Sequence, residues 1–242
     1  MARAIPLSEL TLYSASRPPD PSYNYREGAA FLIEKPKGWT SFDVVKYLRK
    51  CLNLRKVGHA GTLDPMATGL LIVCCGRATK SISQFQELKK VYVAELTFGA
   101  STPSYDTETE VEKRAPYEHI KTESIRSVLD EHFSGTIKQV PPMYSALKYG
   151  GKPLYELARE GKEVEREARQ VTIHETEIME FSPPVLRLRV VCGKGTYIRS
   201  LAYDLAIHLD SLAYLSGLER TAIGEFKNSD ALAIDDLREI KF

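Results

Sequence analysis

The sequence is poor in the features that build metal clusters, disulfide frameworks and membrane spans. It has four cysteines, Cys51, Cys74, Cys75 and Cys192, and no two of them have the C-x-x-C spacing of zinc or redox sites. We therefore predict free thiols, most of them buried in apolar elements. No apolar run approaches the ~18 residues of a membrane helix, and the first residues lack the apolar core of a signal peptide. These absences predict a cytoplasmic protein.

Nucleotide and metal motifs are missing as well. Gly193 and Gly195 follow an alternating segment, but the third position of a dinucleotide-binding motif is Ile198, which is too bulky for close packing. The G-x-x-x-x-G-K-[ST] spacing of a phosphate loop does not occur. The acidic run at 106–112 lacks the glycine and spacing of a calcium loop, so a solvated loop is the preferred interpretation. The sequence predicts neither a metal nor a cofactor.

A large net charge is absent too, because the whole chain carries only +1. Taken whole, this value argues against a nucleic-acid partner. The charge is segregated, however: residues 31–98 hold 11 Lys/Arg against 5 Asp/Glu, whereas residues 99–135 and 201–242 each hold 4 against 8. The basic segment suits the approach of a polyanion, although a solvated basic face explains it about equally well.

The most distinctive stretch that is present covers residues 58–69, GHAGTLDPMATG. Its one carboxylate, Asp64, stands among glycines and turn formers, and Pro65 fixes the backbone directly after it. The apolar run at 70–75 predicts a buried strand, so the loop should present Asp64 at the end of that strand. On its own, an Asp-Pro pair is more typical of a turn residue with a local hydrogen bond.

Strand and helix patterns mix along the chain without strict alternation. They predict an α+β fold with a central, mostly antiparallel mixed sheet flanked by helices. Residues 1–30 indicate an irregular arm or short edge element, and residues 31–242 one domain. Within it, an insertion at about 141–169 interleaves Tyr144, Tyr149 and Tyr155 with lysines. This is typical of a mobile segment facing nucleic acid, although a charged surface helix shows much the same pattern.

Four stretches resemble the motifs of the tRNA pseudouridine synthase B (TruB) family. They are GHAGTLDPMATG, the K-P-x-G-x-T-S box that begins at Lys35, PPMYSALKYGGKPLYELAREG and GTYIRS. The resemblance covers about residues 31–233 and implies the pseudouridine synthase fold. It also implies isomerisation of uridine 55 in the T loop of tRNA, by a monomer that needs no cofactor, membrane or obligatory protein partner. Members commonly continue into a C-terminal RNA-binding PUA domain, which we expect to be absent here.

The resemblance also assigns roles to individual residues. Asp64 is implied to be the nucleophile, Tyr92 the tyrosine that stacks on the target base and takes part in proton transfer, and Arg199 the partner of Asp64. Leu218 matches an apolar pocket position, while Glu219 stands where a second arginine is usual. Asp106 aligns with an acidic position, in unusual surroundings. The residues implied to bind substrate are His59, Lys35, Lys90, Tyr197, Leu218, Lys148, Lys152 and Tyr155.

Physical chemistry supports the need for an arginine near a nucleophilic aspartate. Burial in a dry pocket raises a carboxyl pKa, whereas a nearby arginine lowers it by ~1–3 units. Two other functions fit parts of the sequence. A tRNA folding chaperone needs binding without turnover, but the intact Asp64 argues against an exclusively binding role. A glycoside hydrolase needs a second carboxylate with a strong local motif, and none stands out.

Overall fold

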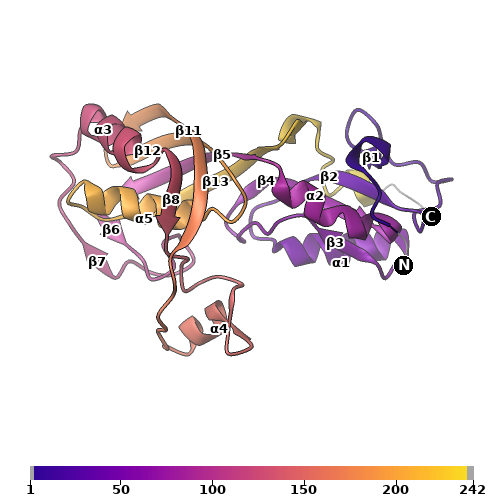
Figure 1. Cartoon of the computed structure of the whole chain (residues 1–242), viewed down its shortest axis with the longest axis horizontal. Coiled ribbons are helices and arrows are strands. Elements are labelled where there is room, and N and C mark those ends of the chain that lie inside the picture. The colour runs from indigo at the N-terminus through magenta and orange to yellow at the C-terminus, as the bar shows by residue number, and fades with distance from the viewer. Residues whose placement is uncertain (1–2, 239–242) are drawn as a thin grey trace. The chain divides into compact units, whose positions relative to one another are not determined.

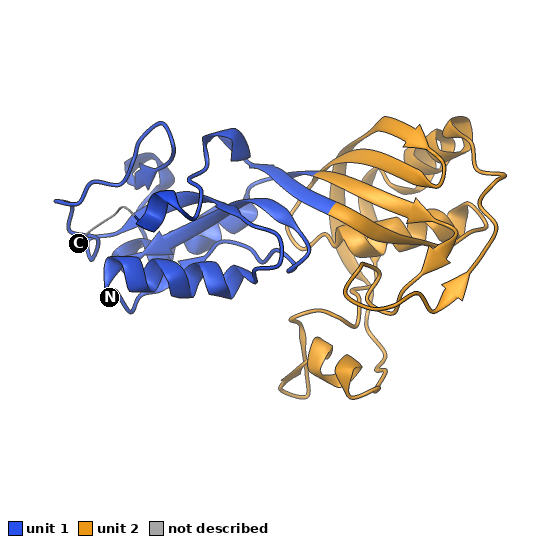
Figure 2. Ribbon diagram, turned by 180° about the vertical axis from the view of Figure 1, so that it is seen from behind, with its two compact units in different colours: residues 1–92, 218–242 blue, residues 93–217 orange. Residues whose placement is uncertain are grey.

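The computed structural model describes residues 3–238, so the ends of the two predicted ranges, 1–2 and 239–242, lie outside the described residues. The chain forms two compact units (Figure 2). Unit 1 combines residues 1–92 and 218–242, and unit 2 consists of residues 93–217. The chain leaves unit 1 within strand β5 (Lys90–Phe98) and returns within strand β13 (Ala213–Ile223). Within residues 3–238, no helix is long and apolar enough to cross a membrane.

In unit 1 the strand order is β1-β2-β4-β13, with β3 beside β4 and β14 beside β13 (Figure 1). Strand β4 runs antiparallel to β2 and β3 and parallel to β13. The strands are β1 (Thr11–Tyr13), β2 (Ala29–Lys35), β3 (Val57–His59), β4 (Thr68–Cys75) and β14 (Phe226–Lys227). The helices are α1 (Ser41–Leu52), α2 (Ile82–Glu87), and the 3-10 segments η1 (Leu7–Glu9), η2 (Gly76–Ser81), η3 (Asn228–Asp230) and η4 (Asp236–Arg238).

Strands β2 and β4 are buried on both faces, because side chains alternate along a strand. One set packs with α1 and includes Phe31, Ile33, Leu71, Val73, Val44 and Leu48. The other set packs with α2 and includes Leu32, Leu70, Ile72 and Phe85. The predicted strand at 70–75 is confirmed. The sequence also places Thr40 and Asp43 at the start of a helix, and in the structure they form the capping box of α1. A strand held on both faces gives the loop before it a rigid base.

The tyrosines of the predicted N-terminal arm are part of the core of unit 1. Tyr13 and Tyr25 are 3% and 5% exposed, and their rings lie 5.3 and 5.7 Å from that of Phe31. Their irregular backbone is fixed by hydroxyl groups: Tyr23 donates to the carbonyl of Gly28 and Tyr25 to that of Asp20. The regular elements before β2 are η1 and β1, and β1 pairs in parallel with β2.

In unit 2 the strand order is β13-β5-β12-β11-β8, and β11 runs antiparallel to both β8 and β12. The elements are β6 (Ala100–Ser101), β7 (Lys113–Arg114), α3 (Thr122–His132), β8 (Gly135–Gln139), β9 (Lys148–Tyr149), β10 (Lys152–Pro153), α4 (Leu154–Arg159), β11 (Arg169–Ser182), β12 (Val185–Cys192) and α5 (Ile198–His208). The predicted α+β fold with a mixed, mostly antiparallel sheet is confirmed.

The predicted insertion forms a small substructure of unit 2. It contains the β9–β10 hairpin and α4, and Figure 1 shows it projecting from the ends of β8 and β11. Its own apolar cluster consists of Met143, Leu154 and Leu157, with Tyr144 and Leu147 packed against them. Three buried apolar residues are a small core, so most side chains of this segment face solvent.

Candidate active site

The Asp64 loop lies in unit 1, between β3 and β4, and the K-P-x-G-x-T-S box holds it in place. The amide of Gly38 donates to the carbonyl of Pro65 at 2.7 Å. Ser41, the first residue of α1, accepts from the amide of Leu63 at 2.8 Å and donates to the carbonyl of the same residue. The box therefore forms hydrogen bonds with the residues on both sides of Asp64. The resemblance implies such a role, because this motif supports the catalytic loop in the family.

Lys35 is the buried centre of this support. Its side chain is fully buried, and Nζ donates to the carbonyl oxygens of Pro36, Trp39 and Pro65. Burial lowers the pKa of Lys35 to about 8, while the negative charge of Asp64 opposes this shift. The predicted substrate-binding lysine thus directs its ammonium group at carbonyl oxygens of its own chain and lies within the electrostatic field of Asp64.

Arg220 is a site residue that the sequence analysis missed. It lies on β13, is 1% exposed, and donates from Nε to Leu70 O at 2.7 Å and from Nη2 to Gly61 O at 3.2 Å. Its two acceptors stand on either side of Asp64 in the sequence. The available signal was strand alternation: two residues beyond the apolar Leu218, position 220 shares its buried side. Glu219, between them, is half-buried and accepts from Asn228.

Gly69 permits the close approach of β4 and β13 beside this site. Its φ is +98°, and a Cβ atom there would lie 2.5 Å from the carbonyl oxygen of Arg220. We expect Gly69→Ala to destabilise the protein by about 3 kcal/mol, because backbone strain and overlap with backbone atoms add. The matched control is Gly38→Ala, since Gly38 has φ +86° but no atom within 4 Å of an added Cβ. Urea midpoints measure both, and equal losses would contradict the close approach.

Four further predicted residues also belong to unit 1. His59 ends β3, and its Nδ1 accepts from the amide of Gly61 at 3.3 Å. Burial lowers the pKa of His59, and the charge of Arg220 lowers it further, so a neutral imidazole is favoured. Lys90 is buried, and its Nζ donates to the carbonyls of Gln86 and Leu88. Tyr92 and Leu218 are each 9% exposed, on β5 and β13.

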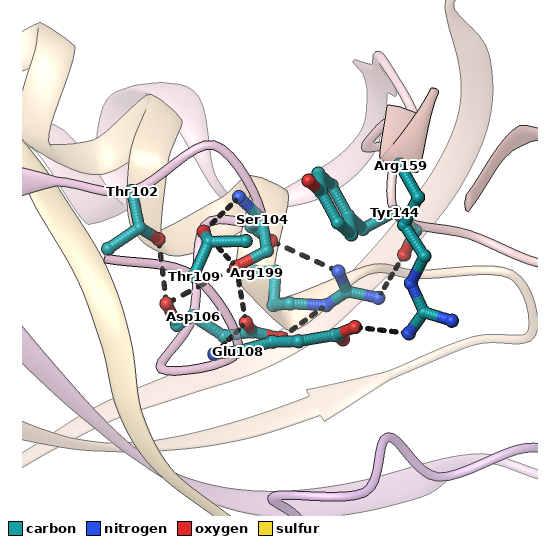
Figure 3. A network of polar contacts seen from close by, with 8 residues as sticks. All are labelled: Thr102, Ser104, Asp106, Glu108, Thr109, Tyr144, Arg159 and Arg199. Atoms are coloured by element: carbon teal, nitrogen blue, oxygen red, sulfur yellow. Dashed lines mark hydrogen bonds and ion pairs between the residues drawn. The ribbon is translucent and has the colours of Figure 1, made fainter. Parts of the chain in front are cut away.

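Arg199 is the centre of a polar network in unit 2 (Figure 3). It stands in the first turn of α5, is 3% exposed, and donates to the carbonyls of Ser104 at 3.0 Å and Tyr144 at 2.8 Å. Its Nε lies 3.5 Å from Oδ2 of Asp106, which is 1% exposed. A guanidinium held from three directions has little rotational freedom.

Asp106 is held as firmly as Arg199. Its Oδ1 accepts from Ser104 Oγ at 2.6 Å and from the amide of Glu108 at 2.8 Å, and Thr102 donates to its carbonyl. Position 106 is therefore not part of a solvated loop, which corrects the interpretation of the acidic run. Burial with a cation explains how this carboxylate is accommodated. The predicted pairing of Arg199 with Asp64 joins residues of two different units, and it stays a prediction.

The insertion and the start of α5 carry the remaining predicted residues. Lys148 and Lys152 are exposed, and Lys152 lies 3.8 Å from Glu160. Tyr155 is half-buried, with the Arg159 guanidinium 5.4 Å from its ring centre. Tyr197 precedes α5, and its backbone is clamped by the buried Gln139 side chain, which both donates to and accepts from it. Exposed cations and an accessible aromatic ring are groups that can contact a nucleic acid.

Comparisons of the sequence with known proteins identify one family. The model of the TruB family pseudouridylate synthase (N terminal domain) matches residues 49–198. A tRNA pseudouridine synthase B of Phocaeicola vulgatus is 46% identical over 222 residues, 89% of this chain and 94% of that protein. One of Parabacteroides distasonis is 52% identical over 204 residues, 82% of this chain and 86% of that protein.

Solved structures support the same fold. A chain from the crystal structure of a Cbf5-Nop10-Gar1 complex matches with a TM-score of 0.67 and 29% identity, over 92% of this chain. The present chain spans 58% of that chain. The family model covers more than half of the sequence, and the relatives align with it over most of both lengths. The chain therefore belongs to the TruB family of pseudouridylate synthases.

Proposed function

We propose that this enzyme converts uridine 55 in the T loop of tRNA into pseudouridine, with Asp64 as the nucleophile. The observation that carries the proposal is the loop around Asp64, where the buried cations Lys35 and Arg220 donate to backbone carbonyls of Gly61, Pro65 and Leu70. A loop held in this way keeps its carboxylate in one place. Relatives about half identical in sequence bear the name tRNA pseudouridine synthase B.

The reaction begins with extrusion of the uridine from the folded loop, at a cost of a few kcal/mol. Stacking on Tyr92 offsets part of this cost, and His59, neutral and half-buried, fills the space left in the RNA. Asp64 then attacks the sugar or assists loss of the C2′ proton, and the N1–C1′ bond breaks. The uracil rotates and its C5 bonds to C1′, while the bond between Asp64 and C1′ breaks or, on the second route, C2′ regains its proton. C5 then loses its proton and N1 gains one.

The insertion protects the detached uracil from water. Water must be excluded while it is free, since hydrolysis would leave an abasic site. The insertion, with Lys148, Lys152 and Tyr155, closes over the T loop and grips its phosphates and bases. No oxidation or hydrolysis occurs, so the mechanism uses no cofactor.

The decisive experiment uses a T-arm RNA labelled with tritium at C5 of uridine. Isomerisation exchanges the C5 proton, so the enzyme should release one tritium for each pseudouridine formed. A folding chaperone would bind the RNA without release. A glycoside hydrolase would liberate uracil and retain the label, so either result would refute the proposal.

Lys35 provides a pH test of the site. Because its pKa lies near 8, we expect kcat/KM to fall above about pH 8, as the ammonium loses the proton that it shares with carbonyl oxygens. Titration of Lys35 does not itself destabilise the folded protein in this range. A lysine in the unfolded chain titrates near 10.5, so between these values the unfolded state binds more protons and the contribution of Lys35 to stability rises with pH.

The measurement is tritium release from pH 6 to 10, with thermal unfolding in parallel. Lys35→Met should give a reduced rate without this alkaline limb. The exposed neighbour serves as control, since Lys37→Met should keep the limb. The same limb in Lys35→Met would assign it to another group.

A further inference from the structure

Unit 1 contains a strongly basic pocket that the proposed mechanism does not use. Its volume is about 620 Å³, and it lies where the end of α1 meets the end of β4. The lining residues are Arg26, Arg49, Asn53, Leu54, Arg55, Lys56, Gly76 and Arg77. Five of these eight carry a positive charge and none a negative one, so the pocket selects for anions.

Few of these charges are neutralised within the protein. Arg77 forms an ion pair with Glu27 at 3.1 Å, and both side chains are more than half exposed, so this pair is weak. Within residues 3–238, no ion pair involves Arg26, Arg55 or Lys56, all of which are exposed. An excess of cations around one hollow costs electrostatic energy that a bound anion would remove.

Arg49, which lines the pocket, is fixed by contacts within unit 1. Its Nη2 donates to the carbonyl of Val57 at 2.8 Å, and its guanidinium stands 5.6 Å from the ring centre of Phe42. Its Nε is buried and has no hydrogen-bond partner within residues 3–238. Guanidinium groups match the paired oxygens of a phosphate, and the lining has no aromatic ring on which a base could stack.

The position of the pocket decides which phosphate it can take. Gly76 follows the last residue of β4, whereas Asp64 precedes the first by four positions. Eight strand residues rise about 3.3 Å each, so Gly76 of the pocket and Thr68, which follows the Asp64 loop, lie roughly 25 Å apart at opposite ends of β4. One ligand reaching both must be long. We propose that this pocket binds backbone phosphates of the RNA substrate, far from the nucleotide that reacts, an inference that rests on the proposed function.

The test is the double variant Arg55→Gln/Lys56→Gln, in which two exposed charges leave the pocket. Binding of a T-arm hairpin at 100 mM salt should weaken by about 10–100-fold, and the slope of log K against log salt should fall by about 2. The single-turnover rate at saturating RNA should not change. The matched control, Arg126→Gln/Lys227→Gln, removes one exposed arginine and one exposed lysine elsewhere. Equal effects in both double variants would overturn the proposal.

A second arm separates RNA from a free anion. Inorganic phosphate is titrated into wild-type protein at constant ionic strength, with heat as the readout. If the pocket variant alone loses phosphate binding while its RNA affinity equals that of the control variant, the pocket binds a free anion and the RNA site is rejected. Binding needs no turnover, so a protein that releases no tritium but loses salt dependence in the pocket variant would refute the proposed reaction and keep the pocket.

Discussion

Asp64→Asn is expected to reduce tritium release by more than about 10⁴-fold, because the amide keeps the shape of the side chain but cannot act as a nucleophile. RNA affinity should stay within about threefold of wild type, since the substitution leaves in place the hydrogen bonds that hold the loop through backbone groups of Pro65, Leu63 and Gly61. Single-turnover kinetics and hairpin titration measure the two quantities separately.

Asp130→Asn is the matched control, because Asp130 is an exposed aspartate on α3. It should leave both quantities unchanged. An Asp64→Asn protein that binds RNA and retains more than a tenth of the wild-type rate would remove Asp64 as the nucleophile. A protein that loses binding as well would show that the carboxylate also shapes the loop.

The second large effect is expected for Arg199→Lys, with kcat/KM lower by about 10³-fold. The guanidinium donates to two carbonyl oxygens and lies beside Asp106, and a single ammonium cannot reproduce this planar fork. The change also leaves the buried Asp106 carboxylate with a poorer partner. Arg187→Lys, at an exposed position on β12, is the control and should be silent.

Asp106 and Arg199 should act as one unit in this reaction. If Asp106 serves only to hold Arg199, the Asp106→Asn/Arg199→Lys double variant will be no slower than Arg199→Lys alone. Additive losses would give Asp106 a separate role. Wild-type kcat/KM in Arg199→Lys would reject the importance of the network altogether.

Local patterns in the sequence were sufficient to predict most elements. The alternation of Tyr92, Ala94, Leu96 and Phe98 matches the buried positions of β5, and the spacing of Val44, Val45 and Leu48 matches the buried face of α1. The sequence predicts Thr122 as the N-cap of α3, whereas Lys121 is the N-cap and Thr122 is the first helical residue. Hydrophobic periodicity identifies which side of an element is buried, but it locates the first and last residues of the element less precisely.

Local sequence patterns could not predict the polar contacts around Asp64 and around Arg199. Lys35 and Lys90 look like surface lysines in sequence, yet carbonyl oxygens surround their ammonium groups. Arg220 donates to the carbonyl of Leu70, which is 150 residues away in the sequence, and Arg199 donates to that of Ser104, which is 95 residues away. The basic segment at 31–98 therefore contains both buried supports and residues of a pocket, a distinction that only the fold makes.

The division of unit 1 into two stretches of chain governs how the protein assembles during synthesis. Unit 2, residues 93–217, is continuous and can fold as soon as it leaves the ribosome, because domains generally fold as units. Unit 1 then still lacks β13, whose Glu219 and Arg220 pair with Thr68 and Gly69, and Leu232, which bridges to Ile33. Without Arg220, the carbonyls of Leu70 and Gly61 have no guanidinium to bind. The Asp64 loop thus gains its contacts with Arg220 only after residue 220 has been made, so a shorter nascent chain holds Asp64 with the support of Lys35, Gly38 and Ser41 alone.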